Sequence, residues 1–370
     1  MTYPGGMSAK RLPKLALIAA SVSASVLVGP ASLAAQEVVQ PLPPPQAYVP
    51  DPAQSGFQAY LATVRPKALR AGVSASTFDR LTTTLTYNPR VVALDRSQSD
   101  APSIPNPPPA PFAPYLARHV DAARINQGRV VYNRERAHLA QIEARTGVPA
   151  GIILGIYGKE TNYGRVTGDF DLLRSLATLA YDGRRRDLFE GELIAAMLMV
   201  ERGTPREALV GSWAGAFGYP QFLPSVYLRL ARDGDGDGRA QIWNNEADAL
   251  ASIAHYLEVA GYKRGERWGY AVSVPASLDR ASLGTPMVSP RCPRVFARHS
   301  RYMPVSEWQR RGIVFQGLQP SADTQLSLIE PDGPGRTGYL ISGSYRAILD
   351  YNCLNHYALA VGILGDAITS

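Results

Sequence analysis

The sequence predicts a mostly helical α+β protein with a small β portion near its C-terminal end. Residues 115–262 place apolar side chains at three- and four-residue spacing, which is the helical period. After Tyr262 the pattern changes to short β-rich runs that Pro and Gly separate. The chain has 370 residues, 45% of them hydrophobic, so it can bury the core of one large domain or of two smaller ones.

The first 35 residues have the layout of a signal peptide. Lys10, Arg11 and Lys14 form a basic region, residues 15–28 are apolar or small, and residues 31–35 offer small side chains for cleavage. The apolar stretch is shorter than the roughly 20 residues of a membrane span, although an uncleaved anchor stays open as an alternative. We therefore expect export to the periplasm and, after cleavage, a soluble protein without a stable membrane span.

Two proline-rich segments punctuate the chain. Residues 36–55 follow the signal peptide and predict an extended tether. Residues 101–114 hold a second cluster, which is too short to separate two domains and predicts a surface loop. The remaining chain, residues 56–370, is then expected to form a single domain.

Within that domain, helices come first and strands later. Helical periodicity covers residues 119–146, 187–201 and 247–260. Runs that favour strands occupy residues 271–275, 312–315, 325–329 and 338–341. A last helix is expected over residues 357–368.

The charge of the chain argues against nucleic acid as a partner. The formal charge is +7, or +4 once the three basic residues of the first 35 are removed, and long Lys/Arg runs are missing. A mild basic surplus suits an extended anionic polymer. The sequence has neither a His-Glu-x-x-His motif nor a Walker-type loop, so no catalytic cofactor is expected. We interpret His255 and His356 as packing residues, and we expect a monomer.

Glu160 is the first candidate for a functional residue. Ile152, Ile153, Ile156 and Tyr157 share one helix face, and Glu160 continues that face four residues after Ile156. A carboxyl group on an apolar face is partly desolvated, which raises its pKa toward the value that a general acid needs near neutrality. The alternative is a Glu at a helix end that turns to solvent or pairs with an Arg, and periodicity alone favours that alternative.

The segment 210–225 is rich in glycine and aromatic residues and also carries Ser212 and Gln221. Glycines let a backbone approach a ligand closely, aromatic faces stack on sugar rings, and the polar side chains supply hydrogen bonds. These features are typical of a groove that binds a glycan. An irregular packed turn is the alternative interpretation.

Four ordered motifs give this pattern a specific resemblance. They are residues 160–164 (Glu-Thr-Asn-Tyr-Gly), 182–186 (Asp-Gly-Arg-Arg-Arg), the segment 211–225, and Tyr351-Asn352 followed by residues 357–361. Together they resemble the lytic transglycosylase B family of peptidoglycan enzymes, over a length from about Phe57 to the C-terminus. The resemblance implies a lysozyme-like core. It implies Glu160 as the catalytic residue and, as sugar-binding residues, Ser212, Gln221, Tyr256, Tyr351, Asn352 and Tyr357, with Tyr115 suggested by spacing alone.

The chemistry that the resemblance implies needs one carboxyl group. Glu160 would protonate the oxygen that links N-acetylmuramic acid to N-acetylglucosamine in peptidoglycan glycan strands. It would then accept the proton of the muramyl 6-hydroxyl, which closes a 1,6-anhydro ring without water. Ordinary glycosidases use two carboxylates. The nearest candidates for a second one are interpreted as turn, cap or charged-surface residues: Asp169, Asp171, Glu190 and Glu192.

Two other functions stay open. One is a lysozyme-type hydrolase on the same scaffold, which would release reducing muramic ends instead of anhydro ends. The other is a glycan-binding protein without catalysis.

An acidic loop predicts a structural Ca²⁺ site within residues 233–248. Asp233, Asp235 and Asp237 occupy positions 1, 3 and 5 of an EF-hand pattern, and Arg239 would supply a backbone carbonyl at position 7. Position 12 is Asn244 rather than Glu, which breaks the pattern. The resembling family completes such a loop with a later acid, a role that Asp248 fits, with Glu246 as a rival. A solvated acidic turn without an ion is the alternative.

The sequence contains two cysteines, Cys292 and Cys353. In an exported protein such a pair is a candidate disulfide. The alternative is two small buried side chains that do not meet.

Overall fold

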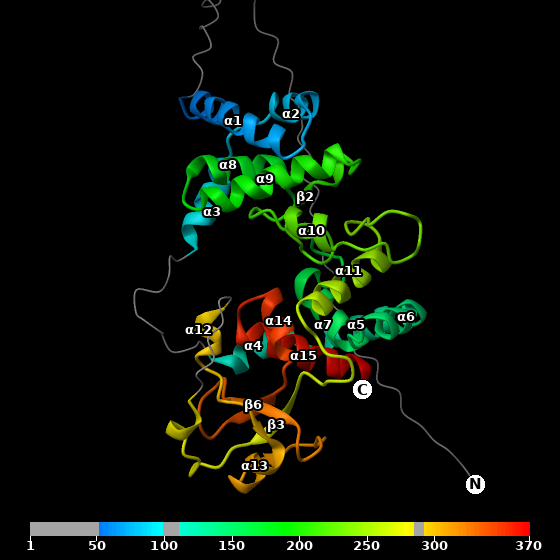
Figure 1. Cartoon of the computed structure of the whole chain (residues 1–370), viewed down its shortest axis with the longest axis vertical. Coiled ribbons are helices and arrows are strands. Elements are labelled where there is room, and N and C mark those ends of the chain that lie inside the picture. Colours follow the sequence, from blue (N-terminus) through cyan, green and yellow to red (C-terminus); the bar gives the residue numbers. More distant parts are fainter. Residues whose placement is uncertain (1–51, 99–110, 285–291) are drawn as a thin grey trace, which may run out of the picture. The chain divides into compact units, whose positions relative to one another are not determined.

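The computed structural model describes residues 52–98, 111–284 and 292–370 (Figure 1). The predicted signal peptide and most of the predicted tether lie outside these residues. No helix in the described ranges is long and apolar enough to cross a membrane. The predicted fold class is confirmed, because helices dominate the chain up to Val259 and a small antiparallel sheet follows.

A first group of helices packs around one hydrophobic core. This core contains Phe57, Leu61, Leu176 and Leu193 among other side chains of these helices. They are α1 (Pro52–Arg70), α2 (Ala75–Thr82), α3 (Pro89–Ser97), α8 (Leu172–Asp182), α9 (Arg186–Glu201) and α10 (Pro224–Leu230). Helix α1 begins at Pro52, so residues 52–55 are helical and the predicted tether is too long at its end; proline is favourable in the first turn of a helix.

A second core holds the helices that bear most of the predicted site. They are α4 (Phe112–His119), α5 (Ala122–Arg134), α6 (Arg136–Thr146), α7 (Ala150–Thr161), α11 (Glu246–Val259), α14 (Tyr345–Tyr351) and α15 (Asn355–Thr369). The prediction of one helix over residues 119–146 is wrong. Asp121 accepts a hydrogen bond from the Arg124 amide at 2.9 Å and starts a new helix, and Glu135 separates that helix from α6.

Helices α7 and α15 approach each other through glycines (Figure 1). A Cβ atom built on Gly155 would lie 2.4 Å from the Val361 carbonyl oxygen, and one on Gly365 would lie 2.3 Å from the Gly151 carbonyl oxygen. Only hydrogen fits at these positions, so the two backbones are in direct contact. This contact fixes the place of α15 relative to the helix that carries Glu160.

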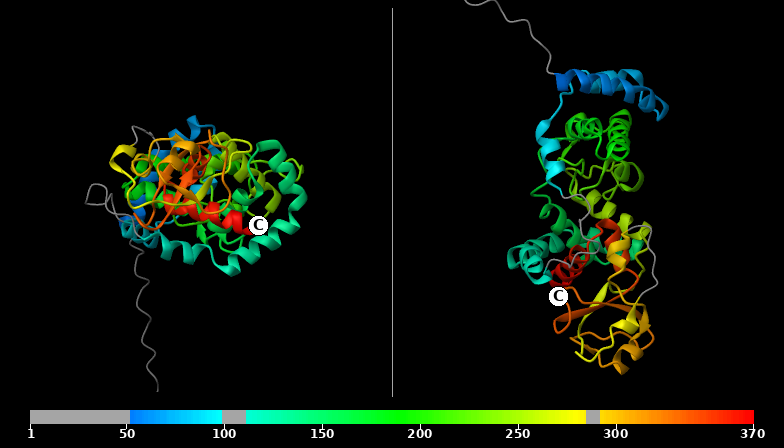
Figure 2. Two further views of the ribbon diagram at one scale, coloured as in Figure 1. Left: turned by 90° about the horizontal axis from the view of Figure 1, so that it is seen from below. Right: turned by 90° about the vertical axis from the view of Figure 1, so that its left-hand side faces the viewer.

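The late β portion forms a five-stranded antiparallel sheet in the order β4-β6-β7-β3-β5. This region is coloured yellow to orange in Figure 2. Its strands are β3 (Gly269–Ser273), β4 (Met303–Pro304), β5 (Val314–Phe315), β6 (Gln325–Ile329) and β7 (Thr337–Ile341). All four predicted strand runs are present, whereas β4 was not predicted. Helix α13 (Val305–Arg310) covers the sheet with the buried Trp308, whose indole donates to the Leu326 carbonyl at 3.0 Å.

Short elements complete the fold. A two-stranded sheet pairs β1 (Phe170–Asp171) with β2 (Val210–Gly211). Two 3-10 helices cover Arg206–Ala208 and Ala281–Leu283, and α12 covers Pro293–Phe296. A disulfide joins Cys292, just before α12, to Cys353, just after α14.

The glycine contact between α7 and α15 predicts opposite effects for two matched substitutions. Gly155→Ala should lower the free energy of unfolding by about 2 kcal/mol, because the new methyl group collides with a backbone carbonyl. Gly191→Ala in α9, where an added Cβ has nothing within 4 Å, should raise it by up to about 1 kcal/mol through helix propensity. Urea denaturation of both variants measures the difference, and equal stabilities would contradict the close packing.

Candidate active site

Glu160 lies in the last turn of α7, a helix that is almost wholly buried. Ile153, Ile156 and Tyr157 are in the core, and Glu160 continues their face as the sequence predicts. The helix ends abruptly after Thr161, because Asn162 and Tyr163 adopt left-handed conformations with φ of 49° and 59°. Asn adopts this conformation readily, whereas it is unfavourable for the buried Tyr163, so packing around Tyr163 must hold it.

Within the part of the chain that the structure describes, the Glu160 carboxyl group has one hydrogen-bond donor. The Tyr357 hydroxyl of α15 donates to Oε1 at 2.5 Å. Burial raises the pKa of Glu160 above the usual carboxyl value, while the Tyr357 hydrogen bond and the nearby charge of Lys159 lower it. Burial is the largest of these effects, so the carboxyl group favours its protonated form more than an exposed Glu does.

Tyrosine rings surround this carboxyl group. Burial raises the pKa of Tyr115 to about 12 and the pKa values of Tyr351 and Tyr357 further, and the charge of Glu160 adds to all three shifts. The three hydroxyls therefore stay protonated near neutrality. Tyr256 packs on Tyr351 with ring centroids 4.7 Å apart, which extends the aromatic wall.

The glycine-rich segment is attached to the same place by two hydrogen bonds. Thr161 Oγ1 donates to the Tyr219 carbonyl at 3.0 Å, and the Tyr351 hydroxyl donates to the Pro220 carbonyl at 2.6 Å. Within the segment, Gln221 has a positive φ of 52°, and the amide group of its side chain donates to the Thr167 carbonyl at 3.1 Å. Ser212 Oγ accepts from the Ala216 amide at 3.0 Å.

The structure brings some of the predicted site residues close to the Glu160 carboxyl group. For the others it shows no interaction with Glu160 within the described residues. Three tyrosines interact with the charge of Glu160: Tyr115, Tyr351 and Tyr357. Tyr256 contacts the ring of Tyr351. Ser212 and Gln221 lie in the segment that Thr161 and Tyr351 hold, and the Asn352 side chain is exposed. Sequence reasoning missed Lys159 and Thr161, although their position beside Glu160 was a signal that could have revealed them.

The carboxylates considered as a second catalytic group have structural roles or lie exposed. Asp171 caps α8 as predicted, by accepting from the Arg174 amide at 2.9 Å, and Asp169 is exposed. The prediction that Glu190 and Glu192 form a charged surface is wrong, because both are buried. Glu190 accepts hydrogen bonds from Tyr60 and Lys67, and Glu192 accepts two from Ser225. The periodicity of α9 predicted that both carboxylates face solvent. Hydrogen-bonding side chains on α1 and α10 instead compensate their burial.

The acidic loop brings three carboxylates together. Ligand oxygens of Asp233, Asp235 and Asp248 lie within 4.8 Å of one another. Asp248 is fully buried and accepts from the amides of Gly234 and Gln241 at 2.7 and 2.6 Å. Three hard oxygen donors at this spacing fit a Ca²⁺ ion.

Two of the other predicted contributors to this loop are used differently. Asp237 lies outside the group of three and accepts from the Arg239 amide at 2.8 Å. Glu246, the rival of Asp248, forms an ion pair with Arg134 instead.

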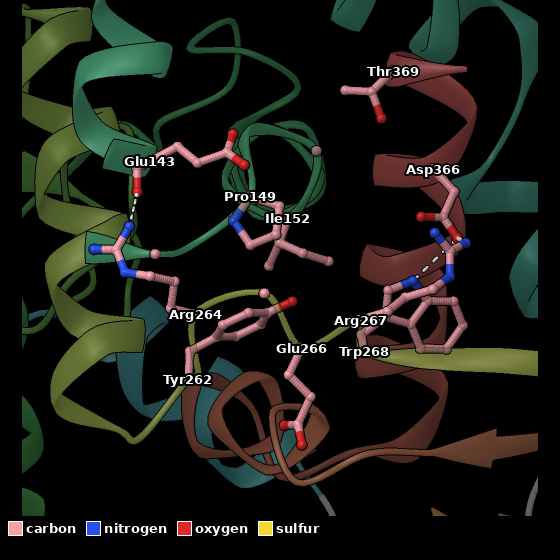
Figure 3. A pocket seen from close by; sticks show the side chains of 13 residues that line it. Glu143, Pro149, Ile152, Tyr262, Arg264, Glu266, Arg267, Trp268, Asp366 and Thr369 are labelled. Atoms are coloured by element: carbon pink, nitrogen blue, oxygen red, sulfur yellow. Dashed lines mark hydrogen bonds and ion pairs between the residues drawn. The ribbon is translucent and has the colours of Figure 1, made fainter. Parts of the chain in front are cut away.

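A separate cavity of about 430 Å³ lies at the other end of α7 (Figure 3). Pro149 and Ile152 line it together with Tyr262, Trp268 and Asp366, but Glu160 and the predicted sugar-binding residues do not. Asp366 is already engaged there, since it pairs with Arg267 and accepts from the Trp268 indole at 3.1 Å. This cavity is therefore distinct from the site around Glu160.

Comparison with known proteins identifies the class to which this fold, with Glu160 at the end of α7, belongs. Residues 56–366 match the model of the transglycosylase SLT domain. This match spans most of the chain, so the chain belongs to the transglycosylase SLT domain family.

Individual relatives agree with that assignment. The chain is 33% identical over 285 residues to the membrane-bound lytic murein transglycosylase B of Escherichia coli (strain K12). The aligned residues cover 75% of this chain and 73% of that protein. SltB3 from Pseudomonas aeruginosa, solved with NAG-anhNAM-pentapeptide, is 36% identical with a TM-score of 0.74, covering 85% of this chain and 80% of SltB3. Slt35 from Escherichia coli, solved with calcium, is 28% identical with a TM-score of 0.67, covering 85% and 93%.

The raised pKa of Glu160 predicts that Glu160→Gln stabilises the folded protein at neutral pH. The folded-state pKa lies above the unfolded value of about 4.3, so folding opposes ionisation once the pH exceeds that value. Below it both states are protonated and the penalty disappears. Thermal denaturation across pH should thus show a gain in Tm that is largest at high pH and shrinks in acid. A variant no more stable than the wild type at pH 7 would contradict the desolvation of Glu160.

Proposed function

We propose that this chain is a lytic transglycosylase that cleaves the β-1,4 bond between N-acetylmuramic acid and N-acetylglucosamine in peptidoglycan. The observation that carries the proposal is the buried Glu160, hydrogen-bonded to Tyr357 and raised in pKa by burial. Among the described residues, no other carboxylate contributes to its pKa. The family and the ligands with which SltB3 was solved, NAG-anhNAM-pentapeptide and NAG-NAM-pentapeptide, support the choice of substrate.

In the first step, Glu160 donates its proton to the glycosidic oxygen. The bond from muramyl C1 to that oxygen breaks, and the positive charge left on the muramyl ring is stabilised by the substrate's own N-acetyl group. In the second step the muramyl 6-hydroxyl attacks C1 while the Glu160 carboxylate takes the hydroxyl proton. Glu160 returns to its protonated form, a 1,6-anhydro ring closes, and no water is consumed.

The surrounding residues orient the sugars in this mechanism. Tyr115, Tyr256, Tyr351 and Tyr357 are the residues that we assign as aromatic faces for the sugar rings. Ser212, Gln221 and Asn352 are the polar residues that we assign to the acetamido and carboxyl groups of the substrate.

The products distinguish this mechanism from hydrolysis. Purified peptidoglycan digested with the enzyme should yield anhydromuramyl ends, which mass spectrometry detects as one water lighter than reducing ends. Glu160→Gln should lower kcat by about a thousandfold because the general acid is lost, whereas Glu258→Gln at an exposed position of α11 should retain activity. Reducing muramic ends would replace the proposal by a lysozyme-type hydrolase.

We also infer that the acidic loop binds a structural Ca²⁺. The Slt35 structure with calcium supports this assignment. Asp233, Asp235 and Asp248 would hold the ion, whose positive charge offsets the repulsion among the three carboxylates. The ion would fix the loop that precedes α11, the helix that bears Tyr256.

Calcium is therefore expected to raise the Tm of the wild-type protein. At a concentration one hundred times Kd, linkage gives about 2.7 kcal/mol of stabilisation. Asp235→Asn should weaken this response, while Asp323→Asn, which removes an equally exposed charge outside the loop, should leave it intact. Differential scanning fluorimetry with calcium and with a chelator measures both. An unchanged Tm in the wild type would leave the loop as an acidic turn.

The place of action that we propose is the periplasm. The basic and apolar layout of residues 1–35 supports export, and a peptidoglycan substrate is accessible there. The disulfide between Cys292 and Cys353 is compatible with an oxidising compartment.

A further inference from the structure

Lys159 is held next to the carboxyl group that performs the proposed chemistry. It precedes Glu160 in the last turn of α7, and its ammonium nitrogen lies 5.4 Å from the ring centroid of Tyr357 and 5.5 Å from that of Tyr115. Both distances allow cation–π attraction, which fixes the ammonium group between two rings of the site.

This ammonium group has no hydrogen bond or ion pair with any residue of the described ranges. Lys67 provides the contrast, because its ammonium group pairs with Glu190 at 2.6 Å. Burial lowers the pKa of Lys159, while the charge of Glu160 raises it. A half-buried cation that keeps free donors is costly unless an anion binds to it.

Apart from the carboxyl groups of Glu160 and Asp121, the charged and titratable groups that act on this place are positive or neutral. Arg124 of α5 acts on Lys159 with the same sign of charge. His119 of α4 is neutral near pH 7, because burial and the charge of Lys159 lower its pKa to about 4. Asp121, the acid on this side, already caps α5 and lies 3.5 Å from Arg124. An anionic group brought by a ligand would therefore be attracted here.

We propose that Lys159 is a specificity-determining residue whose ammonium group, held between Tyr115 and Tyr357, binds a carboxylate of the muramyl side chain or its peptide. The inference rests on the proposed function, since it assumes a peptidoglycan strand in the site. A muramyl residue carries such a carboxylate on its lactyl group where the peptide is absent, and on the peptide where the lactyl group is an amide. Binding one of them favours muramyl residues over neutral amino sugars at this position.

Lys159 has a second possible action, which is to alter the acidity of Glu160 without touching the substrate. Strands with and without carboxylates distinguish the two actions. A residue that acts only through Glu160 changes the cleavage of every strand alike, whereas a residue that binds a carboxylate matters only where the strand carries one.

The test uses two forms of the same glycan strands. One form keeps its carboxylates, and in the other carbodiimide and ammonia have converted them to neutral amides. With the intact form, Lys159→Met should raise KM about tenfold and change kcat little, as expected for the loss of a charge-assisted hydrogen bond. With the amidated form, wild type and Lys159→Met should have the same KM.

Two further variants complete the design. Lys159→Arg keeps the charge and should restore most of the affinity for the intact strands, while Lys263→Met makes the same side-chain change at an exposed lysine and should behave as wild type. Equal losses on both substrate forms would overturn the inference and leave the proposed function standing. The absence of anhydromuramyl ends in wild-type digests would instead reject the proposed function itself.

Discussion

The contact between α7 and α15 is the constraint on which the site depends. Gly155 and Gly365 let the two backbones touch, and neither position has room for a Cβ atom. Because the helices are this close, Tyr357 near the start of α15 reaches the Glu160 carboxyl group near the end of α7 with a hydrogen bond of 2.5 Å. A wider separation would remove the hydrogen bond and admit water to the carboxyl group. The acid chemistry that we propose for Glu160 therefore depends on two positions at which no side chain fits.

Glu160 is compensated less than the buried carboxylates that serve the fold. Asp95 pairs with Arg184 and Arg185. The three others each accept from two partner groups, as follows: Glu190 from Tyr60 and Lys67, Glu192 from the amide and hydroxyl of Ser225, and Asp248 from two backbone amides. Glu160 accepts from one phenol. Among these five carboxyl groups of the described residues, Glu160 thus has the fewest donors, and burial is the largest influence on its pKa, which it raises.

The parts of the structure that local pattern governs could be predicted from the sequence. Periodicity predicts helices α9 and α11 and the five-residue strands β3, β6 and β7. It also predicts the apolar face of α7 that ends in Glu160. Tertiary contacts account for the failures. Nothing in the sequence around Glu190 indicates a tyrosine and a lysine 130 and 123 residues away. The partner of Glu160 lies 197 residues further along, and only the family resemblance pointed to Tyr357.

The site also lies where the two helical cores meet, which explains why so many of its residues are fixed by the backbone of another segment. Tyr357 belongs to the core around α7, the helix that carries Glu160, whereas Phe222 and Tyr256 belong to the core around α8 and α9. Two side chains join them, since Thr161 donates to the Tyr219 carbonyl and Tyr351 to the Pro220 carbonyl. Backbone carbonyls make these links independent of the side chains at positions 219 and 220. The distance between Glu160 and the glycine-rich segment is thus set by α7 and α14.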